Sequence, residues 1–195
     1  MAFQKNNLGF TLVEMMVVIG VLSIVIVGLI AIFVSAIQIQ RYVASAYQLL
    51  DQSSYIMEYM TRAIRLAKKD LEGNCITQYN SYGYYDEIND SGIKFTNKNE
   101  DGDCIGFFLD NTDKRLKQYK KESGGGQAVI SPLTSSAMEV SAFNVILAGE
   151  SQETDQEQPK ATIYLEIKVK GAGSQPSIKL QTTVSMRDLD IAPSL

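Results

Sequence analysis

The chain of 195 residues contains no histidine. This absence excludes the Ser-His-Asp and Cys-His catalytic arrangements and every zinc site that uses histidine. Two cysteines are too few for a four-thiolate metal site, and the sequence shows no nucleophile motif and no phosphate-binding loop. We therefore expect a protein that is not an enzyme and that carries no cofactor.

The chain also has fewer basic than acidic residues. The chain has 18 Lys and Arg against 22 Asp and Glu, which gives a formal net charge of −4 at pH 7. Charge-driven binding of nucleic acid requires an excess of basic residues. We therefore do not expect nucleic acid among the partners of this protein.

Charge of either sign is missing from Met15 to Ile37, and no proline interrupts the stretch from Phe10 to Glu72. A helix over the charge-free run would be about 35 Å long, enough to cross a bilayer. Beyond it, apolar residues recur at helical spacing on one stripe, namely Val43, Tyr47, Leu50, Met57, Met60, Ile64, Ala67 and Leu71. We predict one helix that is membrane-spanning over residues 10–40 and amphipathic over residues 41–72, and that ends at Gly73-Asn74.

From Cys75 onward the apolar period changes to two, which is typical of strands. The predicted strands are residues 92–98, 104–110, 115–121, 142–147, 161–170 and 178–186. Short turns between neighbouring strands indicate an antiparallel meander. The apolar face of such a sheet needs a cover, and the amphipathic half of the helix is the available partner. The predicted fold class is α+β, with a long N-terminal helix packed on an antiparallel β-sheet head at residues 73–195.

The residues just before the apolar run, Leu-Gly-Phe-Thr-Leu-Val-Glu at positions 8–14, form the most informative motif. They place one carboxylate, Glu14, at the head of a membrane-length segment, where an acid is costly unless a cation meets it. This motif resembles the N-terminus of type IV pilins and type II secretion pseudopilins. The resemblance implies a leader at residues 1–9, cleavage after Gly9 by a prepilin peptidase, and N-methylation of Phe10.

In that family the glutamate is an assembly residue, whose carboxylate pairs with the free amine of a neighbouring subunit. By the resemblance, Glu14 has this role. In the alternative reading, Glu14 is a first-turn acid that complements the positive end of the helix. Gly9, likewise, is either the residue before the scissile bond or an ordinary loop glycine.

The resemblance implies a minor pilin or pseudopilin that assembles with other pilins through its N-terminal helix. It would sit in the cytoplasmic membrane as a single-pass protein with its C-terminal head outside, and would then enter a pilus or pseudopilus. The final strand, with Gln-Thr-Thr followed by Arg-Asp, resembles J-type pseudopilins and W-type minor pilins. Two alternatives remain: a major pilin of the filament shaft, and a membrane-anchored extracytoplasmic binding domain that does not polymerise.

Cys75 follows the predicted helix and Cys104 opens a predicted strand. In an exported domain, oxidising conditions favour their pairing. A disulfide between them would join helix and sheet and stabilise the fold by about 3 kcal/mol. The alternative is a pair of buried free thiols.

The segment around Asp101-Gly102 has oxygen ligands at alternate positions, and its calcium candidates are Asn97, Asn99, Asp101 and Asp103. An EF-hand would need a bidentate glutamate where Phe108 stands. A polar hairpin turn explains the segment without an ion, so we expect no metal. Some secretion pseudopilins do bind calcium, which keeps the other reading open.

Two further clusters stand out. The first is a group of tyrosines, Tyr79, Tyr82, Tyr84 and Tyr85, which we interpret as a clamp for the loop between helix and sheet, or else as a contact surface for a partner. The second is a basic strand with Lys114, Arg115, Lys117, Lys120 and Lys121. Such charges are typical of a strand at the edge of a sheet.

Overall fold

The computed structural model describes residues 9–85, 92–97, 102–124, 126–149, 157–171 and 175–187. Most of the expected leader and two of the calcium candidates, Asn99 and Asp101, lie outside these ranges. The chain divides into two compact units, residues 1–44 and residues 45–195. Each unit is described separately below.

One long helix, α1 (Leu12–Arg65), begins in the first unit and ends in the second. At 1.5 Å per residue its 54 residues measure about 81 Å. In the first unit the side chains from Leu12 to Ala36 are all exposed, and α1 is long and apolar enough to cross a membrane. A helix that is apolar on every side buries those side chains in lipid or against other apolar helices.

In the second unit, α1 turns one face inward. The buried residues on this face are Leu49, Ser53, Ile56, Met57, Met60 and Ile64. The predicted stripe was therefore right at four positions, Met57, Met60, Ile64 and Ala67, which are buried. It was wrong at the other four, Val43, Tyr47, Leu50 and Leu71, which are 43%, 69%, 46% and 62% exposed. Neighbouring stripes on one helix have similar composition here, so packing against the sheets selects the one that is buried.

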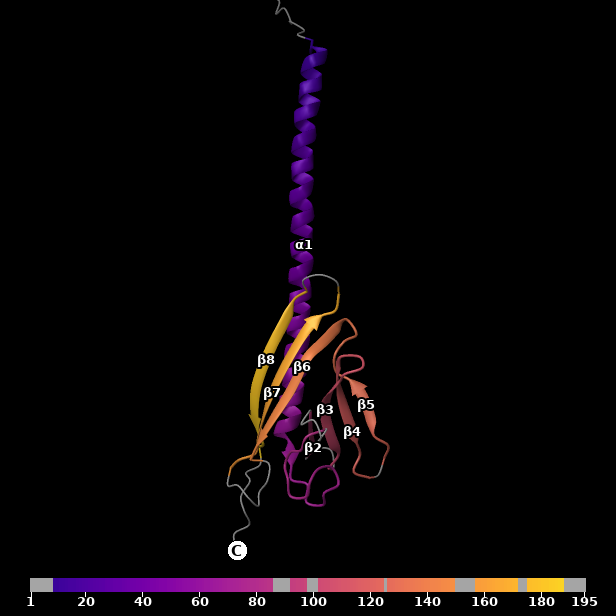
Figure 1. Ribbon diagram of the computed structural model, residues 1–195, viewed down its shortest axis with the longest axis vertical. Coiled ribbons are helices and arrows are strands. Elements are labelled where there is room, and N and C mark those ends of the chain that lie inside the picture. The colour runs from indigo at the N-terminus through magenta and orange to yellow at the C-terminus, as the bar shows by residue number, and fades with distance from the viewer. Residues whose placement is uncertain are drawn as a thin grey trace, which may run out of the picture. The chain divides into compact units, whose positions relative to one another are not determined.

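Eight strands follow α1 in the described part of the chain. They are β1 (Ala67–Lys68), β2 (Ile93–Asn97), β3 (Cys104–Asp110), β4 (Arg115–Lys121), β5 (Val129–Pro132), β6 (Met138–Ala148), β7 (Lys160–Val169) and β8 (Ser177–Ser185). One sheet has the order β1-β2-β3-β4-β5 and the other the order β6-β7-β8, and all pairs are antiparallel. The predicted antiparallel meander is confirmed, although the strands form two sheets (Figure 1).

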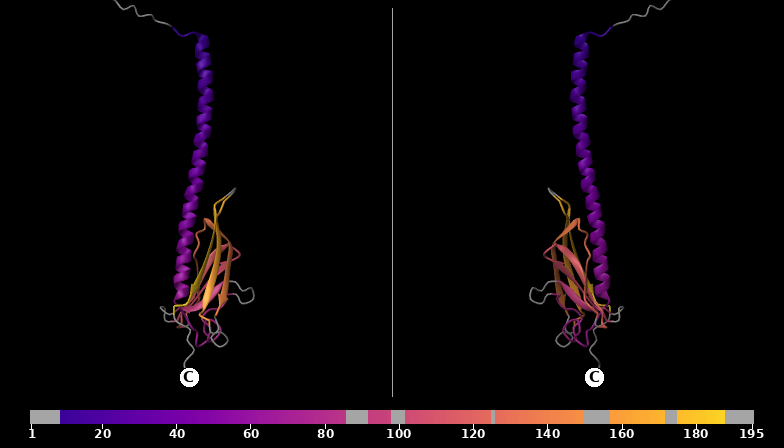
Figure 2. Two further views of the ribbon diagram at one scale, coloured as in Figure 1. Left: turned by 90° about the vertical axis from the view of Figure 1, so that its left-hand side faces the viewer. Right: turned by 90° about the vertical axis from the view of Figure 1, so that its right-hand side faces the viewer.

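The C-terminal part of α1 lies along the strands in both views of Figure 2. A single hydrophobic core joins it to both sheets, with Met60 and Ile64 from α1, Phe107 from the first sheet, and Phe143 and Leu165 from the second. The alternation predicted for β7 is also confirmed, because its Ile163, Leu165 and Ile167 are buried while the residues between them are partly exposed. The fold class is thus α+β, a long helix packed on antiparallel sheets.

The end of the helix differs from the prediction. α1 ends at Arg65, seven residues before Glu72, and Ala67–Lys68 pairs with β2 instead. Donors from elsewhere in the fold satisfy the last carbonyls: the Tyr82 hydroxyl donates to Ile64 O at 3.1 Å, and Arg187 N–H donates to Arg65 O at 3.0 Å. Since carbonyls at a helix end need such partners, these contacts allow the helix to stop early.

The basic strand is also not an edge. β5, which the sequence did not predict, pairs with β4 from Lys117↔Pro132 to Lys120↔Val129 and itself forms the edge. The sequence of β5, Val-Ile-Ser-Pro, does not alternate between apolar and polar residues, so it has no strand pattern to detect. All four of its residues are exposed. Its final residue, Pro132, is tolerated because an outer strand leaves some N–H groups unpaired.

Candidate functional site

The N-terminal motif forms the first turn of α1. Thr11 precedes the helix, and its Oγ1 accepts a hydrogen bond from Glu14 N–H at 3.2 Å. The Thr11 carbonyl accepts the first helical bond, from Met15 N–H, also at 3.2 Å. Thr11 is therefore the N-cap, and the sequence Thr-x-x-Glu has the spacing of a capping box. This spacing is a signal for the start of a helix that can be read in the sequence itself.

The expected cleavage site is open. Gly9 is exposed, and a Cβ atom placed on it would meet nothing within 4 Å. The side chain of Phe10 is 73% exposed. The chain's own packing therefore does not require glycine at this position, and a requirement for it would come from an enzyme that binds the segment.

Glu14 is exposed, and it is the single charged residue from Gly9 to Gln40. Its position in the first turn suits the positive end of the helix dipole. The carboxylate thus has two available roles, one within its own helix and one toward a cation from another chain.

In the second unit, a loop follows the helix and is joined to the first sheet by a disulfide between Cys75 and Cys104. This is the pairing expected for these two residues, and it links the loop to the start of β3. Asp70, which sequence analysis missed, organises the same loop from within. Its side chain is only 5% exposed.

The Asp70 carboxylate accepts hydrogen bonds from successive backbone N–H groups of the loop. Oδ1 accepts from Gly73 at 2.9 Å, and Oδ2 accepts from Cys75 at 2.6 Å and Ile76 at 3.0 Å. Burial by itself raises the pKa of Asp70, but the backbone donors outweigh it and hold the pKa below its ordinary value. Asp followed three residues later by Gly is a turn signal that could have pointed to this loop.

The tyrosines fasten this region to the fold. Tyr82 is fully buried, and burial raises its pKa. Tyr85 stacks on Phe108 with a centroid distance of 4.1 Å, and Tyr84 accepts a hydrogen bond from Leu147 N–H at 3.4 Å. These contacts agree with the clamp interpretation for three of the four residues, whereas Tyr79 is 44% exposed.

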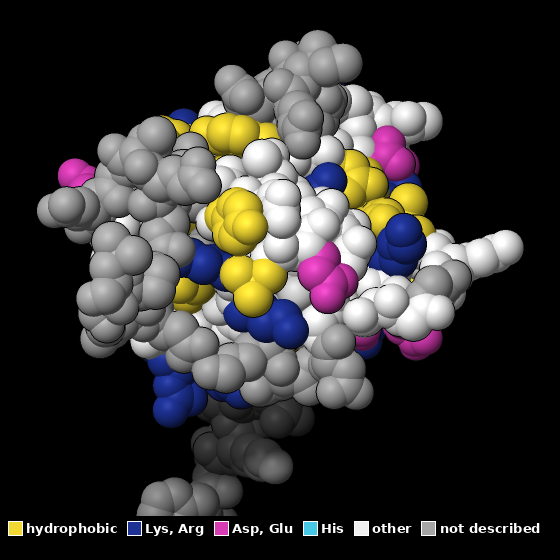
Figure 3. Space-filling view, turned by 90° about the horizontal axis from the view of Figure 1, so that it is seen from below, with side chains coloured by type: hydrophobic (Ala, Val, Ile, Leu, Met, Phe, Trp, Pro, Cys, Tyr) yellow, Lys and Arg dark blue, Asp and Glu magenta, His cyan; other side chains and the backbone are white. Residues whose placement is uncertain are grey.

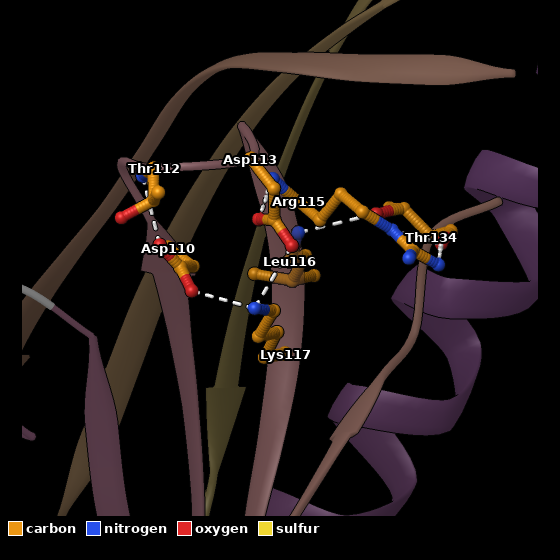
Figure 4. A network of polar contacts seen from close by, with 7 residues as sticks. All are labelled: Asp110, Thr112, Asp113, Arg115, Leu116, Lys117 and Thr134. Carbon is orange, nitrogen blue, oxygen red and sulfur yellow. Dashed lines mark hydrogen bonds and ion pairs between the residues drawn. The ribbon is translucent and has the colours of Figure 1, made fainter. Parts of the chain in front are cut away.

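The basic residues at the start of β4 are engaged within the second unit (Figure 4). Lys117 Nζ lies 2.5 Å from Asp110 Oδ2 and 2.9 Å from Asp113 Oδ2. The hydrogen bond from Lys117 lowers the pKa of Asp110 to about 2. The hydrogen bonds that Lys117 donates to Asp110 and Asp113 raise its own pKa. Arg115 donates two hydrogen bonds to the carbonyl of Thr134, whose hydroxyl accepts from Leu116 N–H.

The two calcium candidates within the described ranges have other contacts. Asp103 Oδ1 accepts from Ser123 N–H at 3.1 Å, and its Oδ2 lies 3.4 Å from Lys120 Nζ. Asn97 N–H donates to the Asp103 carbonyl at 2.9 Å. Among the described residues, no group of three or more His, Cys, Asp or Glu side chains could hold a metal ion.

Comparison with known proteins bears on the N-terminal segment alone. Residues 4–30 match the family model described as the prokaryotic N-terminal methylation motif. No curated protein matched the chain, and no solved structure did. The match covers the capped first turn and the beginning of the apolar helix, and proteins with this motif are structural subunits rather than enzymes. These observations support a type IV pilin-like prepilin with a membrane-anchoring helix.

Proposed function

We propose that this chain is a minor pilin or pseudopilin that a prepilin peptidase cleaves after Gly9 and that assembles through its N-terminal helix. One observation carries the proposal. An exposed Gly9–Phe10 bond precedes a capped helix whose single charge before Arg41 is Glu14. The helix anchors the precursor in the cytoplasmic membrane, with the second unit outside.

Assembly follows from the same charge. Cleavage before Phe10 creates a free amine, and methylation of that amine leaves it cationic. Two opposite charges in an apolar setting attract one another far more strongly than they do in water. Glu14 of one subunit and the amine of its neighbour therefore set the axial register of the packed helices.

Processing is tested by intact mass and N-terminal sequencing of the protein extracted from membranes. We expect the mature chain to begin at a methylated Phe10. Gly9→Val should leave the uncleaved precursor, because a branched side chain obstructs the peptidase. Gly20→Val is the matched control, since a Cβ at Gly20 also meets nothing within 4 Å and the site lies outside residues 8–14, which surround the expected cleavage site. Normal cleavage of Gly9→Val would contradict the proposal.

The role of Glu14 is tested with two substitutions. Glutamine keeps a side chain of the capping-box type without the charge, whereas alanine removes the side chain and its charge; both keep the Glu14 N–H that bonds Thr11 Oγ1. If the charge pairs with a neighbour, Glu14→Gln and Glu14→Ala should both be cleaved, and both should enter filaments at least about tenfold less, because breaking a buried ion pair costs about 3–5 kcal/mol.

Quantitative immunoblots of sheared filaments measure this incorporation. Glu58→Gln is the control, since its ion pair with Arg62 lies on the surface and contributes little. Normal incorporation of Glu14→Gln alone would assign Glu14 to helix capping. Normal incorporation of both variants would leave the residue without an assembly role.

A further inference from the structure

The two sheets of the second unit have strand edges whose backbone groups point away from the sheet. β8 is the outermost strand of the second sheet, and β7 is its one strand neighbour among the described residues (Figure 1). On the face viewed from below, Figure 3 shows small groups of hydrophobic side chains between charged and polar ones. The backbone groups at the edge of β8 therefore form a more distinctive surface than the side chains on that face.

The hydrogen bonds between β7 and β8 show which backbone groups of β8 remain at the edge. At the two ends of this pair, Val169 N–H donates to Pro176 O and Met186 N–H donates to Pro159 O, both at 3.1 Å. Hydrogen-bonded pairs alternate with non-hydrogen-bonded pairs along antiparallel strands. The even-numbered residues of β8 therefore bond to β7, whereas the odd-numbered residues direct N–H and C=O outward. The outward residues, all of them exposed, are Ser177, Lys179, Gln181, Thr183 and Ser185.

These outward groups are open. In the described part of the chain, no hydrogen bond reaches the backbone N–H or C=O of the five outward residues of β8. The next outward donor, Arg187 N–H, does have a partner, Arg65 O at 3.0 Å. The end of α1 thus closes this edge just beyond β8, and the nine residues of β8 itself remain available.

The edge of the first sheet at β5 is protected by contrast. Leu133 N–H donates to Leu116 O at 2.8 Å in continuation of the β4–β5 register, so the outward residues of β5 are Ile130 and Pro132. Proline has no N–H, so this short edge offers a single outward donor. Proline on an outer strand is a common means of preventing the addition of another strand.

The remaining edges are also short or occupied. On the outer side of β6, Val140 N–H donates to Lys114 O at 2.9 Å, and Leu147 N–H donates to the Tyr84 hydroxyl at 3.4 Å. β1, at the other edge of the first sheet, has two residues. β8 is therefore the long edge that the described fold leaves without proline and without partners.

The chemistry of this edge specifies what can bind to it. Another extended backbone carries alternating donors and acceptors at the same spacing, and such strand addition is a general mode of peptide recognition. On one face, an added strand would lie beside Lys179, Gln181 and Thr183. On the other face it would lie beside Ile178 and Leu180, which are partly buried against the hydrophobic core. A matching segment therefore alternates polar and apolar residues.

We propose that the free edge of β8 binds an extended segment of another polypeptide, which adds to the second sheet as a further antiparallel strand. A second copy of β8 fits this place poorly. The C-terminal part of α1 lies along the strands (Figure 2), so antiparallel pairing of two β8 strands would direct their α1 helices in opposite directions. Two copies anchored in one membrane cannot do this; that argument alone rests on the proposed function. Parallel pairing of the two edges would place the polar face of one sheet beside the apolar face of the other.

The test uses the full chain in detergent and a fluorescent peptide with the sequence of β7, Lys160–Val169, which pairs with β8 within the fold. At the free edge the peptide would bond through Thr162, Tyr164 and Glu166, whose side chains continue the polar face. We expect saturable binding by fluorescence anisotropy. N-methylation of the peptide at these three residues should weaken binding at least about tenfold, because it removes hydrogen bonds. N-methylation at the residue after each of them is the matched control and should change affinity little.

Gln181, the central outward residue, allows a second comparison. Gln181→Pro removes the outward N–H and should weaken peptide binding about tenfold. Gln181→Ala keeps that N–H and should bind like the parent, because the backbone makes the contact. Circular dichroism checks that Gln181→Pro remains folded, and the methylated peptides test the edge without altering the protein.

Hydrogen exchange of single amides gives an independent readout. Without peptide, the odd-numbered amides of β8 should exchange faster than the even-numbered ones, and the peptide should slow the odd-numbered amides. Absence of saturable binding, or equal affinity of the two methylated peptides, would overturn the proposal. A peptide-free dimer in sedimentation that Gln181→Pro dissociates would also overturn it and would assign the edge to a second copy. None of these outcomes bears on cleavage after Gly9.

Discussion

At the scale of single residues, Asp70 shows how one buried acid can organise a loop. The loop from Glu72 to Ile76 makes no regular ladder, so its N–H groups need other acceptors. The carboxylate provides them and remains charged because several dipoles point at it. Gly73, with φ of +73°, adopts the left-handed conformation that this turn requires.

We expect Asp70→Asn to lower the free energy of unfolding at pH 7 by about 1.5–3 kcal/mol, the range for hydrogen bonds to a charged group. The amide keeps one acceptor oxygen and turns an NH₂ group toward backbone donors. Denaturant unfolding followed by near-ultraviolet circular dichroism would measure the change. Asp51→Asn, at an exposed position on α1, is the control and should change stability little.

The same contacts make stability depend on pH. The pKa of Asp70 is lower in the folded chain than in the unfolded chain, where it is about 3.9. Its contribution is therefore complete above the unfolded pKa and is lost as the pH falls through the folded pKa. Between neutral and strongly acidic pH, the parent should lose more stability than Asp70→Asn. Parallel pH profiles of the two proteins would argue against this assignment.

At the level of secondary-structure elements, tertiary contacts determine where α1 ends. Tyr82 and Arg187 come from distant parts of the chain and cap the carbonyls of Ile64 and Arg65. Helical spacing continues through Ala67 and Leu71, so periodicity alone favours a longer helix. Pairing of Ala67–Lys68 with β2 competes with that preference and prevails.

Tyr82→Phe tests this capping. The ring still fills its buried site, but Ile64 O loses its donor, so we expect a loss of about 1 kcal/mol in unfolding free energy. Tyr79→Phe is the matched control because the Tyr79 side chain is 44% exposed. Equal stability of Tyr82→Phe and the parent would mean that water or another donor replaces the hydroxyl.

In the molecule as a whole, the two compact units need different surroundings. The apolar part of α1 needs lipid or other apolar helices, whereas the second unit has its own core and a surface of mixed charge. This division is what a subunit requires if it is first anchored in a membrane and then packed into a filament. The minor pilin or pseudopilin proposed above differs from a major shaft pilin in how many copies enter the filament.

Abundance distinguishes the two kinds of subunit. In sheared filaments we expect this chain to be present at a small fraction of the amount of the shaft pilin, as measured by quantitative mass spectrometry. Stoichiometry equal to that of the main filament protein would identify it as a major pilin. Its absence from filaments while it remains processed in the membrane would favour a binding domain that does not polymerise.

The apolar N-terminal helix, the motif around Gly9 and Glu14, the α+β class and most strands are visible in the amino-acid order, because each depends on neighbouring residues or on a short period. Three features follow instead from long-range packing: the face of α1 that is buried, the residue at which the helix stops, and the pairing of β5 with β4. These features depend on contacts between residues far apart in the chain. Strand register and the competition for backbone hydrogen bonds settle them, and neither has a periodic signature.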